Sequence, residues 1–469
     1  MARVQPLPRV TCEFEGASLG DARRSARLLE IAEALDRDPR GGFPRAMGSE
    51  AELEGFYRFI NNDGFSPGEI LAPHVAATLQ RARDSACVVV VHDTTQVAYG
   101  GLARRDGLGI VSSRYDQGFI AHVALMLSAD GTPLGVAHVE TLTRSGTKRR
   151  GSSRTHRVKR EDDRRESLRW VRSVHAVEDA RDGTFEAVHV TDAEGDFFEL
   201  LADLHQRRAR FVIRAGQLDR TVEIDGAPVS LRAAVNGVKP RLYREVSLSE
   251  RRFAKRSVRH HNHPERSARS VRLAIGTTTV RIRKTKYSDV RCEPFAVNVV
   301  RVWEVAPPAG EPRVEWILLT TEAADTSAAL ARLVDTYRLR WTIEEYFKAL
   351  KSGCSLEQRQ IESYDGLRKV LALFVPIAYR LLLLRSLERA APGRPAGLMF
   401  SPAELHLMRH APSNRGLPAP TTLSDALRHL ARLGGHLRNN GRPGWQTLAR
   451  GYEKLLSLRL GWEIARAAS

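Results

Sequence analysis

Residues 86–95 read ACVVVVHDTT, a run of four valines followed by a histidine and an aspartate. An unbroken apolar run of this length is typical of a β-strand that is buried on both faces of a sheet. The run therefore predicts a central strand that ends at Asp93. An ionised carboxylate in that position is unfavourable unless it is paired or bound to a cation, so Asp93 is the first candidate functional residue.

The segments that follow predict further strands of the same sheet. Residues 119–144 predict a hairpin of two strands. Residues 185–206 predict a strand that ends near Asp192 and then a helix, and RFVIRAG at 210–216 predicts the next strand. Three antiparallel strands followed by strand, helix and strand is the order of an RNase H-like mixed α/β sheet, which carries carboxylates at its strand ends.

The stretch DAEGD at 192–196 offers three acids for the second strand end. Asp196 precedes Glu199 by three residues, and the two are expected to form a capping pair for the following helix. Glu194 is expected to lie in a solvated turn. Asp192 is therefore the candidate at this strand end.

A third candidate acid lies in DTYRLRWTIEEYFKALKSGC, residues 335–354, which predicts an amphipathic helix. On a helical wheel, an apolar side lies opposite a polar stripe formed by Tyr337, Arg340, Glu344, Lys348 and Lys351. Taken alone, this stripe is most simply a solvated face on which Glu344 pairs with Lys348.

The two strand-end acids favour another interpretation of the stripe. If Asp93 and Asp192 lie on neighbouring strands, their mutual repulsion must be relieved by protonation or by a divalent cation. With Glu344 they offer three hard oxygen donors, which suit Mg²⁺ or Mn²⁺. Two such ions can catalyse an in-line phosphoryl transfer. The basic neighbours on the helix would then hold the phosphates: Arg340, Lys348 and Lys351.

The charge of the chain supports a nucleic-acid partner. Its 469 residues include 73 Lys and Arg against 55 Asp and Glu, which gives a formal net charge of +18. Such a balance favours a polyanion through counterion release. The four cysteines lie far apart without a C-x-x-C pair. This spacing argues against a structural zinc site or disulfides and favours a reducing cytoplasm.

The length predicts two or three domains. Residues 1–70 are expected to form a helical domain that either binds duplex DNA or is a solvated cap, and its outward arginines are Arg23, Arg24, Arg27 and Arg58. Residues 71–375 are expected to form the core, with a β-rich insertion at about 217–315. Residues 376–469 are expected to form a helical C-terminal domain.

Three further segments are unusual in composition. Residues 144–170 are strongly basic and predict a loop whose charge either lies along phosphates or is solvated. The cluster HHNH at 260–263 could suggest a metal, but the flanking arginines and Pro264 favour a solvated loop. The apolar run at 367–384 is interrupted by charges, so it predicts a buried helix kinked at Pro376 and not a membrane span.

The polar stripe matches a known signature. Y-x2-R-x3-E-x6-K is the signature of the DDE transposases of the bacterial insertion-sequence-four family, which move by hairpin-forming cut and paste. Tyr337, Arg340, Glu344 and Lys351 have this spacing inside YRLRWTIEEYFKALK. The chain resembles this family along nearly its whole length, with DTT at 93–95 similar to the first acid motif and DAEGD similar to the second.

The resemblance implies roles for individual residues. It implies that two Mg²⁺ ions, which Mn²⁺ can replace, are bound by Asp93, Asp192 and Glu344. It implies that the phosphates of the transposon end are contacted by Tyr337, Arg340, Lys351 and Arg214. Trp316 matches the tryptophan that stacks on a flipped base when the hairpin forms. Ala193 departs from the arginine usual in the family, which leaves one auxiliary polar contact in question but not the three acids.

The expected function is therefore that of a Mg²⁺-dependent DNA transposase. Its N-terminal helices would recognise the inverted ends of the element, and its core would nick, form and resolve a hairpin, and transfer the 3′ end. The resemblance also implies a homodimer formed through the C-terminal helices. Two alternatives remain open: an RNase H-like, structure-specific nuclease without strand transfer, and a catalytically silent DNA-binding protein derived from a transposase. The three acids argue against the silent protein.

Overall fold

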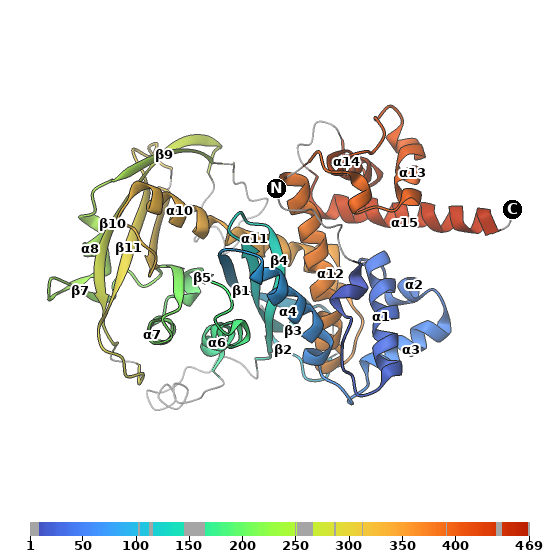
Figure 1. The fold of residues 1–469 in the computed structure, drawn as a ribbon, viewed down its shortest axis with the longest axis horizontal. Helices are drawn as coiled ribbons and strands as arrows, with labels where there is room; N and C mark the ends of the chain where they lie inside the picture. Colours follow the sequence, from blue (N-terminus) through green and yellow to red (C-terminus); the bar gives the residue numbers. More distant parts are fainter. Residues whose placement is uncertain are drawn as a thin grey trace.

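The computed structural model describes residues 9–101, 104–111, 116–144, 165–248, 250, 266–285, 288–311, 313–390, 392–437 and 443–467. Figure 1 shows one large twisted sheet, with the N-terminal and C-terminal helices gathered beside one end of it around the long helix α12 (Tyr364–Ala390). Every candidate site residue lies within the described parts. The basic residues 145–164 and the histidine cluster at 260–263 lie outside them.

The N-terminal region is helical, as predicted. After a 3-10 turn, η1 (Val10–Glu13), it consists of α1 (Ala22–Arg37), α2 (Phe43–Met47), α3 (Glu50–Ile60) and α4 (Pro67–Arg83). The side chain of Ser49 accepts a hydrogen bond from the main-chain N–H of Glu52 at the start of α3, and Ser66 forms a reciprocal capping box with Glu69 at the start of α4. Residue 70 lies inside α4, which continues toward the sheet.

The central strands are β1 (Val88–Tyr99), β2 (Gly109–Ile110), β3 (Gln117–Ser128), β4 (Pro133–Leu142), β5 (Ala187–Thr191) and β6 (Arg210–Arg214). β3 pairs antiparallel with β1 and β4, and β5 is parallel to β1 and β6. Helix α6 (Arg169–Arg181) precedes β5, and α7 (Phe198–Gln206) connects β5 to β6. Along the chain, the predicted succession of strands and helix is present, and the resulting sheet order β4-β3-β1-β5-β6 is consistent with an RNase H-like core.

β1 is longer than the sequence predicts. The valine run predicts a strand end at Asp93, but β1 continues to Tyr99 because β3 stays paired with it over that whole length. The parallel pairing with β5 stops earlier, at Val91 and Val190. Asp93 therefore lies where the neighbouring strand ends and not at the end of its own strand.

The predicted insertion continues the same sheet. β6 pairs with β12 (Glu315–Thr320), which is followed across the sheet by β11 (Phe295–Glu304), β10 (Arg269–Ile282), β7 (Thr221–Ile224) and β8 (Ala227–Ser230). β9 (Leu242–Leu248) pairs with β10, and α8 (Leu231–Asn236) follows β8. The described residues thus form a single sheet of 12 strands.

Alternate residues of the valine run face two different cores. Val89 and Val91 belong to the large apolar cluster that includes Phe374 of α12, whereas Val88 and Val90 pack in a separate cluster with α6. β1 is therefore covered on both faces, as an unbroken apolar run predicts.

The remaining helices are α10 (Ser327–Arg338), α11 (Trp341–Lys348), α12 (Tyr364–Ala390), α13 (Pro402–His410), α14 (Leu423–Leu433) and α15 (Trp445–Ala467). α12 contains Pro376 and is the central helix of the main core. Among the described helices, α12 alone is long and apolar enough to cross a membrane. However, 61% of its most apolar window is buried inside the protein, as in the core helix of a soluble protein.

Candidate active site

Asp93 and Asp192 lie where β1 and β5 separate. The parallel ladder between these strands stops two residues before each acid, and continuing its register brings Asp93 opposite Asp192. Each carboxylate accepts a hydrogen bond from a nearby main-chain N–H. Thr94 N is 2.7 Å from Asp93 Oδ1, and Glu194 N is 2.9 Å from Asp192 Oδ1. The two strand acids are therefore held by their own local backbone.

The predicted helix over residues 335–354 is interrupted. α10 ends at Arg338, α11 spans Trp341–Lys348, and a π-helical turn follows at Ala349–Gly353. A helical wheel assumes one unbroken helix, so the predicted polar stripe is not a single face. Tyr337, which precedes the break, is only 2% exposed and belongs to the core.

Glu344 is linked to the strand acid Asp93 through Arg340, a residue at this break. Arg340 Nη1 lies 3.4 Å from Asp93 Oδ2, and Arg340 Nη2 lies 2.9 Å from Glu344 Oε1. The arginine is buried, with 7% of its surface exposed. One guanidinium thus connects a carboxylate of the sheet with a carboxylate of α11.

The electrostatic environment couples all three acids. Burial raises the pKa of Asp93 to about 7, and the negative charges of Asp192 and Glu344 act in the same direction. Burial by itself would lower the pKa of Arg340, but the neighbouring Tyr337 and the two acids outweigh burial, so its pKa is raised and it stays charged. Because the ionised form of Asp93 is disfavoured in this environment, additional positive charge nearby would stabilise it.

The two aromatic residues of the predicted site lie together. Trp316 of β12 and Tyr337 of α10 pack edge to face, with their ring centroids 5.7 Å apart. Arg214, at the end of β6, is half-buried, and its charge partly offsets the effect of burial on the pKa of Tyr337. The structure therefore groups Trp316, Tyr337 and Arg214 beside the acids.

The two predicted phosphate-binding lysines form ion pairs within the protein. Lys348 pairs with Glu345 at 2.8 Å, and not with Glu344 as the helical wheel predicts. Lys351 pairs with Glu357 at 3.1 Å and donates a hydrogen bond to a main-chain carbonyl of β1. Lys351 therefore lies against the strand that carries Asp93, whereas Lys348 is 57% exposed.

Asp196 does not cap the following helix, contrary to the sequence prediction. α7 begins without a side-chain cap, and Asp196 is 1% exposed. It accepts hydrogen bonds from two main-chain N–H groups just after β6 and forms a buried ion pair with Arg220 at 2.6 Å. Glu199, its predicted capping partner, pairs with Arg165. The role of Asp196 is therefore structural, as the sequence suggests, but the contacts that it makes stabilise the chain after β6 and not the start of α7.

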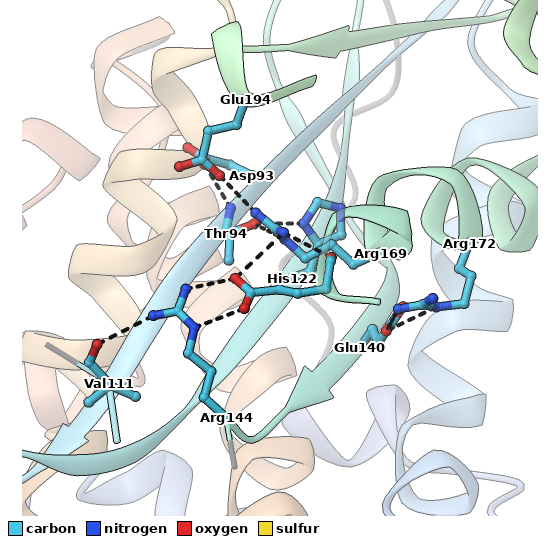
Figure 2. Close-up of polar contacts among 10 residues, drawn as sticks. Asp93, Thr94, Val111, His122, Glu140, Arg144, Arg169, Arg172 and Glu194 are labelled. Atoms are coloured by element: carbon cyan, nitrogen blue, oxygen red, sulfur yellow. Dashed lines mark hydrogen bonds and ion pairs between the residues drawn. The ribbon is translucent and has the colours of Figure 1, made fainter. Parts of the chain in front are cut away.

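Sequence reasoning did not identify Arg169, the first residue of α6. Figure 2 shows its guanidinium between Thr94, which follows Asp93, and Glu194, which lies in the second acid motif. Arg169 Nε donates to Thr94 Oγ1 at 2.9 Å, and Nη2 pairs with Glu194 Oε2 at 2.7 Å. These partners lie 75 and 25 residues away in the chain, so no local pattern could have indicated them.

The N-terminal arginines differ in exposure. Arg23 is almost fully exposed, with 94% of its side-chain surface accessible. Arg27 and Arg58 are also accessible, and each pairs with a glutamate of its own helix. Arg24 instead donates a hydrogen bond to the main-chain oxygen of Leu19. These exposures are compatible with duplex binding and with a solvated cap.

The acids suit a divalent cation chemically. Carboxylate oxygens are the hard donors that Mg²⁺ and Mn²⁺ prefer, and the raised pKa of Asp93 marks a site that favours added positive charge. Within the described residues, however, no three His, Cys, Asp or Glu side chains are already arranged to hold a metal ion. Arg340 supplies the positive charge that connects Asp93 and Glu344.

Two family models match the chain. A model described as transposase DNA-binding matches residues 10–65, and a model described as transposase DDE domain matches residues 126–375. The second match covers more than half of the 469 residues and contains Asp192 and Glu344. Asp93 lies before the start of this range. It is on β1, which pairs with β3, and the matched range begins within β3 at residue 126.

Proposed function

Because the chain belongs to the DDE transposases, we propose that it moves a DNA element of the insertion-sequence-four type by hairpin-forming cut and paste. One observation carries the proposal. Asp93 is opposite Asp192 by strand register and shares the guanidinium of Arg340 with Glu344, so three acids far apart in sequence form one coupled group. The proposed setting is an RNase H-like core, acting on DNA in the cytoplasm.

The proposed chemistry is phosphoryl transfer at a DNA strand. Two Mg²⁺ ions, or Mn²⁺, when bound by Asp93, Asp192 and Glu344, would activate the attacking oxygen and stabilise the leaving one. The protein supplies the three carboxylates from two strands and one helix. Arg340 contacts two of the acids, and in the proposed mechanism its guanidinium exchanges these carboxylates for a DNA phosphate when the substrate binds.

DNA contacts are proposed on three parts of the chain. Residues 10–65, with the exposed Arg23 and Arg58, would recognise the inverted ends of the element. Around the acids, the end phosphates would be contacted by Tyr337, Arg340, Lys348, Lys351 and Arg214. Trp316, half-buried against Tyr337, would stack on the flipped base of the hairpin.

The test is a cleavage assay with the protein and a duplex that carries one inverted end of the element. With Mg²⁺ we expect a nick at the end, a hairpin on a denaturing gel, and a joined product when target DNA is added. Cleavage of unrelated duplexes at the same rate, with no joined product, would favour the nuclease instead. Specific binding without any cleavage would favour the silent DNA-binding protein.

We expect that replacing Arg340 with glutamine strengthens cation binding while it slows cleavage. In the DNA-free protein, Arg340 competes with a cation for Asp93 and Glu344, so its removal should raise the affinity for Mn²⁺ by about tenfold. Mn²⁺ titration followed by electron paramagnetic resonance measures this change. Arg338→Gln is the control, because Arg338 is exposed and pairs with Asp335. Equal Mn²⁺ affinity in Arg340→Gln and the wild type would refute the proposed competition.

A homodimer is proposed through the last helix. Toward the end of α15, Leu460 and Ile464 are 60% and 63% exposed. They are four residues apart, so they form a solvent-exposed apolar stripe on one face of the helix. Leu460→Glu with Ile464→Glu should weaken dimer formation on end DNA at least about tenfold, as judged by light scattering. Lys454→Glu, an exposed change on the same helix, should leave it unaltered. An unchanged dimer in the double variant would exclude this stripe.

A further inference from the structure

Arg169 is a buried arginine whose three nitrogens have three different partners. It is 6% exposed and begins α6. Besides Thr94 Oγ1 and Glu194 Oε2, its Nη1 donates to the main-chain oxygen of Glu166 at 2.9 Å. That third bond lies within its own turn and fixes the guanidinium relative to the start of the helix. The other two bonds extend to the two acid motifs (Figure 2).

The two long-range partners are related to the acids in the same way. The main-chain N–H of Thr94 holds Asp93 Oδ1, and the side chain of Thr94 binds Arg169. The main-chain N–H of Glu194 holds Asp192 Oδ1, and the side chain of Glu194 also binds Arg169. A path of four hydrogen bonds, joined by the covalent bonds of Thr94 and Glu194, therefore runs from one acid to the other with Arg169 at its centre.

We propose that Arg169 is a positioning residue that fixes the separation and orientation of Asp93 relative to Asp192. This inference rests on the proposed role of the two acids in cation binding. The main-chain ladder between β1 and β5 stops two residues before the acids, so the ladder itself does not set their spacing. Arg169 connects the two strands beyond that point.

Thr94 and Glu194 do not need Arg169 to satisfy their hydrogen-bonding groups. Thr94 Oγ1 already has a second partner, Nδ1 of the buried His122 at 2.9 Å. The Glu194 side chain is 64% exposed and could be solvated without Arg169. Neither group requires the arginine in order to be satisfied. What Arg169 adds is the link between the two motifs.

The experiment compares Arg169→Gln with Arg172→Gln in the full chain. Arg172 lies one turn further along α6 and pairs with Glu140 of β4. For Arg169→Gln we expect Mn²⁺ affinity in the DNA-free protein, and nicking at the end, to fall about 10- to 100-fold, the usual effect of losing a residue that orients metal ligands. Binding of end DNA without metal should stay within about twofold of wild type, because Arg169 is buried. Arg172→Gln should keep wild-type Mn²⁺ affinity.

Glu194→Gln protects the test against a folding defect. Its side chain is mostly exposed, so the variant should melt at the wild-type temperature, and it weakens one of the two long-range contacts of Arg169 because glutamine keeps an acceptor oxygen but lacks the negative charge. It should lower Mn²⁺ affinity in the same direction as Arg169→Gln, but less. Unchanged affinity in both variants would overturn the inference. A wild-type protein that neither binds Mn²⁺ nor nicks DNA would instead overturn the proposed function on which the inference depends.

Discussion

Glu344→Gln should lower the rate of nicking at the transposon end by about 10²- to 10³-fold, the range for removing one group that stabilises transition-state charge. Glutamine keeps the shape of the side chain but removes the negative charge that faces Arg340 at 2.9 Å. The side chain is 36% exposed, so its loss leaves no buried cavity. A single-turnover assay on a labelled end duplex measures the rate, and a gel-shift titration should give end binding within about twofold of wild type.

The next residue of the helix provides the matched control. Glu345 has the same side chain but points to the C-terminal helices, where it accepts a hydrogen bond from Trp445 Nε1 at 2.9 Å and pairs with Arg385. Glu345→Gln should therefore leave the chemical step unchanged. If Glu344→Gln nicked at the wild-type rate, or if both variants lost activity equally, the proposal that Glu344 is a metal ligand in the reaction would be refuted.

The strands of the catalytic region were predictable because their signal is local. Four consecutive valines require burial on both faces, and the structure divides them between two apolar clusters. The order of the strands fixed the neighbours of β1, and that adjacency brings Asp93 to Asp192. The sequence thus identified the two acids as candidates that would meet if their strands were neighbours, but it did not predict where β1 ends. β1 continues because β3, a partner distant in sequence, stays paired with it.

The helix over 335–354 shows why the rest of the site could not be predicted. Its sequence contains no proline near the break between α10 and α11, so a single wheel was the natural expectation. The break places Tyr337 in the core and Arg340 between two acids. This arrangement includes the ion pair between Arg340 and Asp93, which lie 247 positions apart, and periodicity carries no information about such a contact.

A second large effect is expected far from the acids, at Glu13 in the region that matches the transposase DNA-binding model. Glu13 is 1% exposed and binds Arg81 at 2.9 Å and His74 Nδ1 at 2.5 Å. His74 Nε2 accepts a hydrogen bond from the main-chain N–H of Val136. The proton of the ring is therefore on Nδ1, which donates a hydrogen bond to Glu13. This network joins the N-terminal segment to α4 and β4.

Burial by itself would raise the pKa of Glu13, but the hydrogen bonds that it accepts from His74 and Arg81, together with the charge of Arg81, outweigh burial and lower the pKa from 4.5 to about 2. The ionised form is therefore favoured by folding, and it contributes about 3 kcal/mol to the free energy of unfolding at neutral pH. Glu13→Gln should remove this contribution at pH 7, as measured by chemical denaturation.

The difference between the Glu13→Gln variant and the wild type should depend on pH. A carboxylate with a lowered folded-state pKa stabilises the protein above its unfolded-state pKa, and the contribution is lost as pH falls from about 4.5 toward 2. The difference in unfolding free energy should therefore shrink to roughly half by pH 3. Glu15→Gln, an exposed change two residues away, should alter stability by less than about 0.5 kcal/mol at any of these pH values. A Glu13→Gln effect that did not change with pH would mean that lost packing, and not the buried charge, sets the stability of this region.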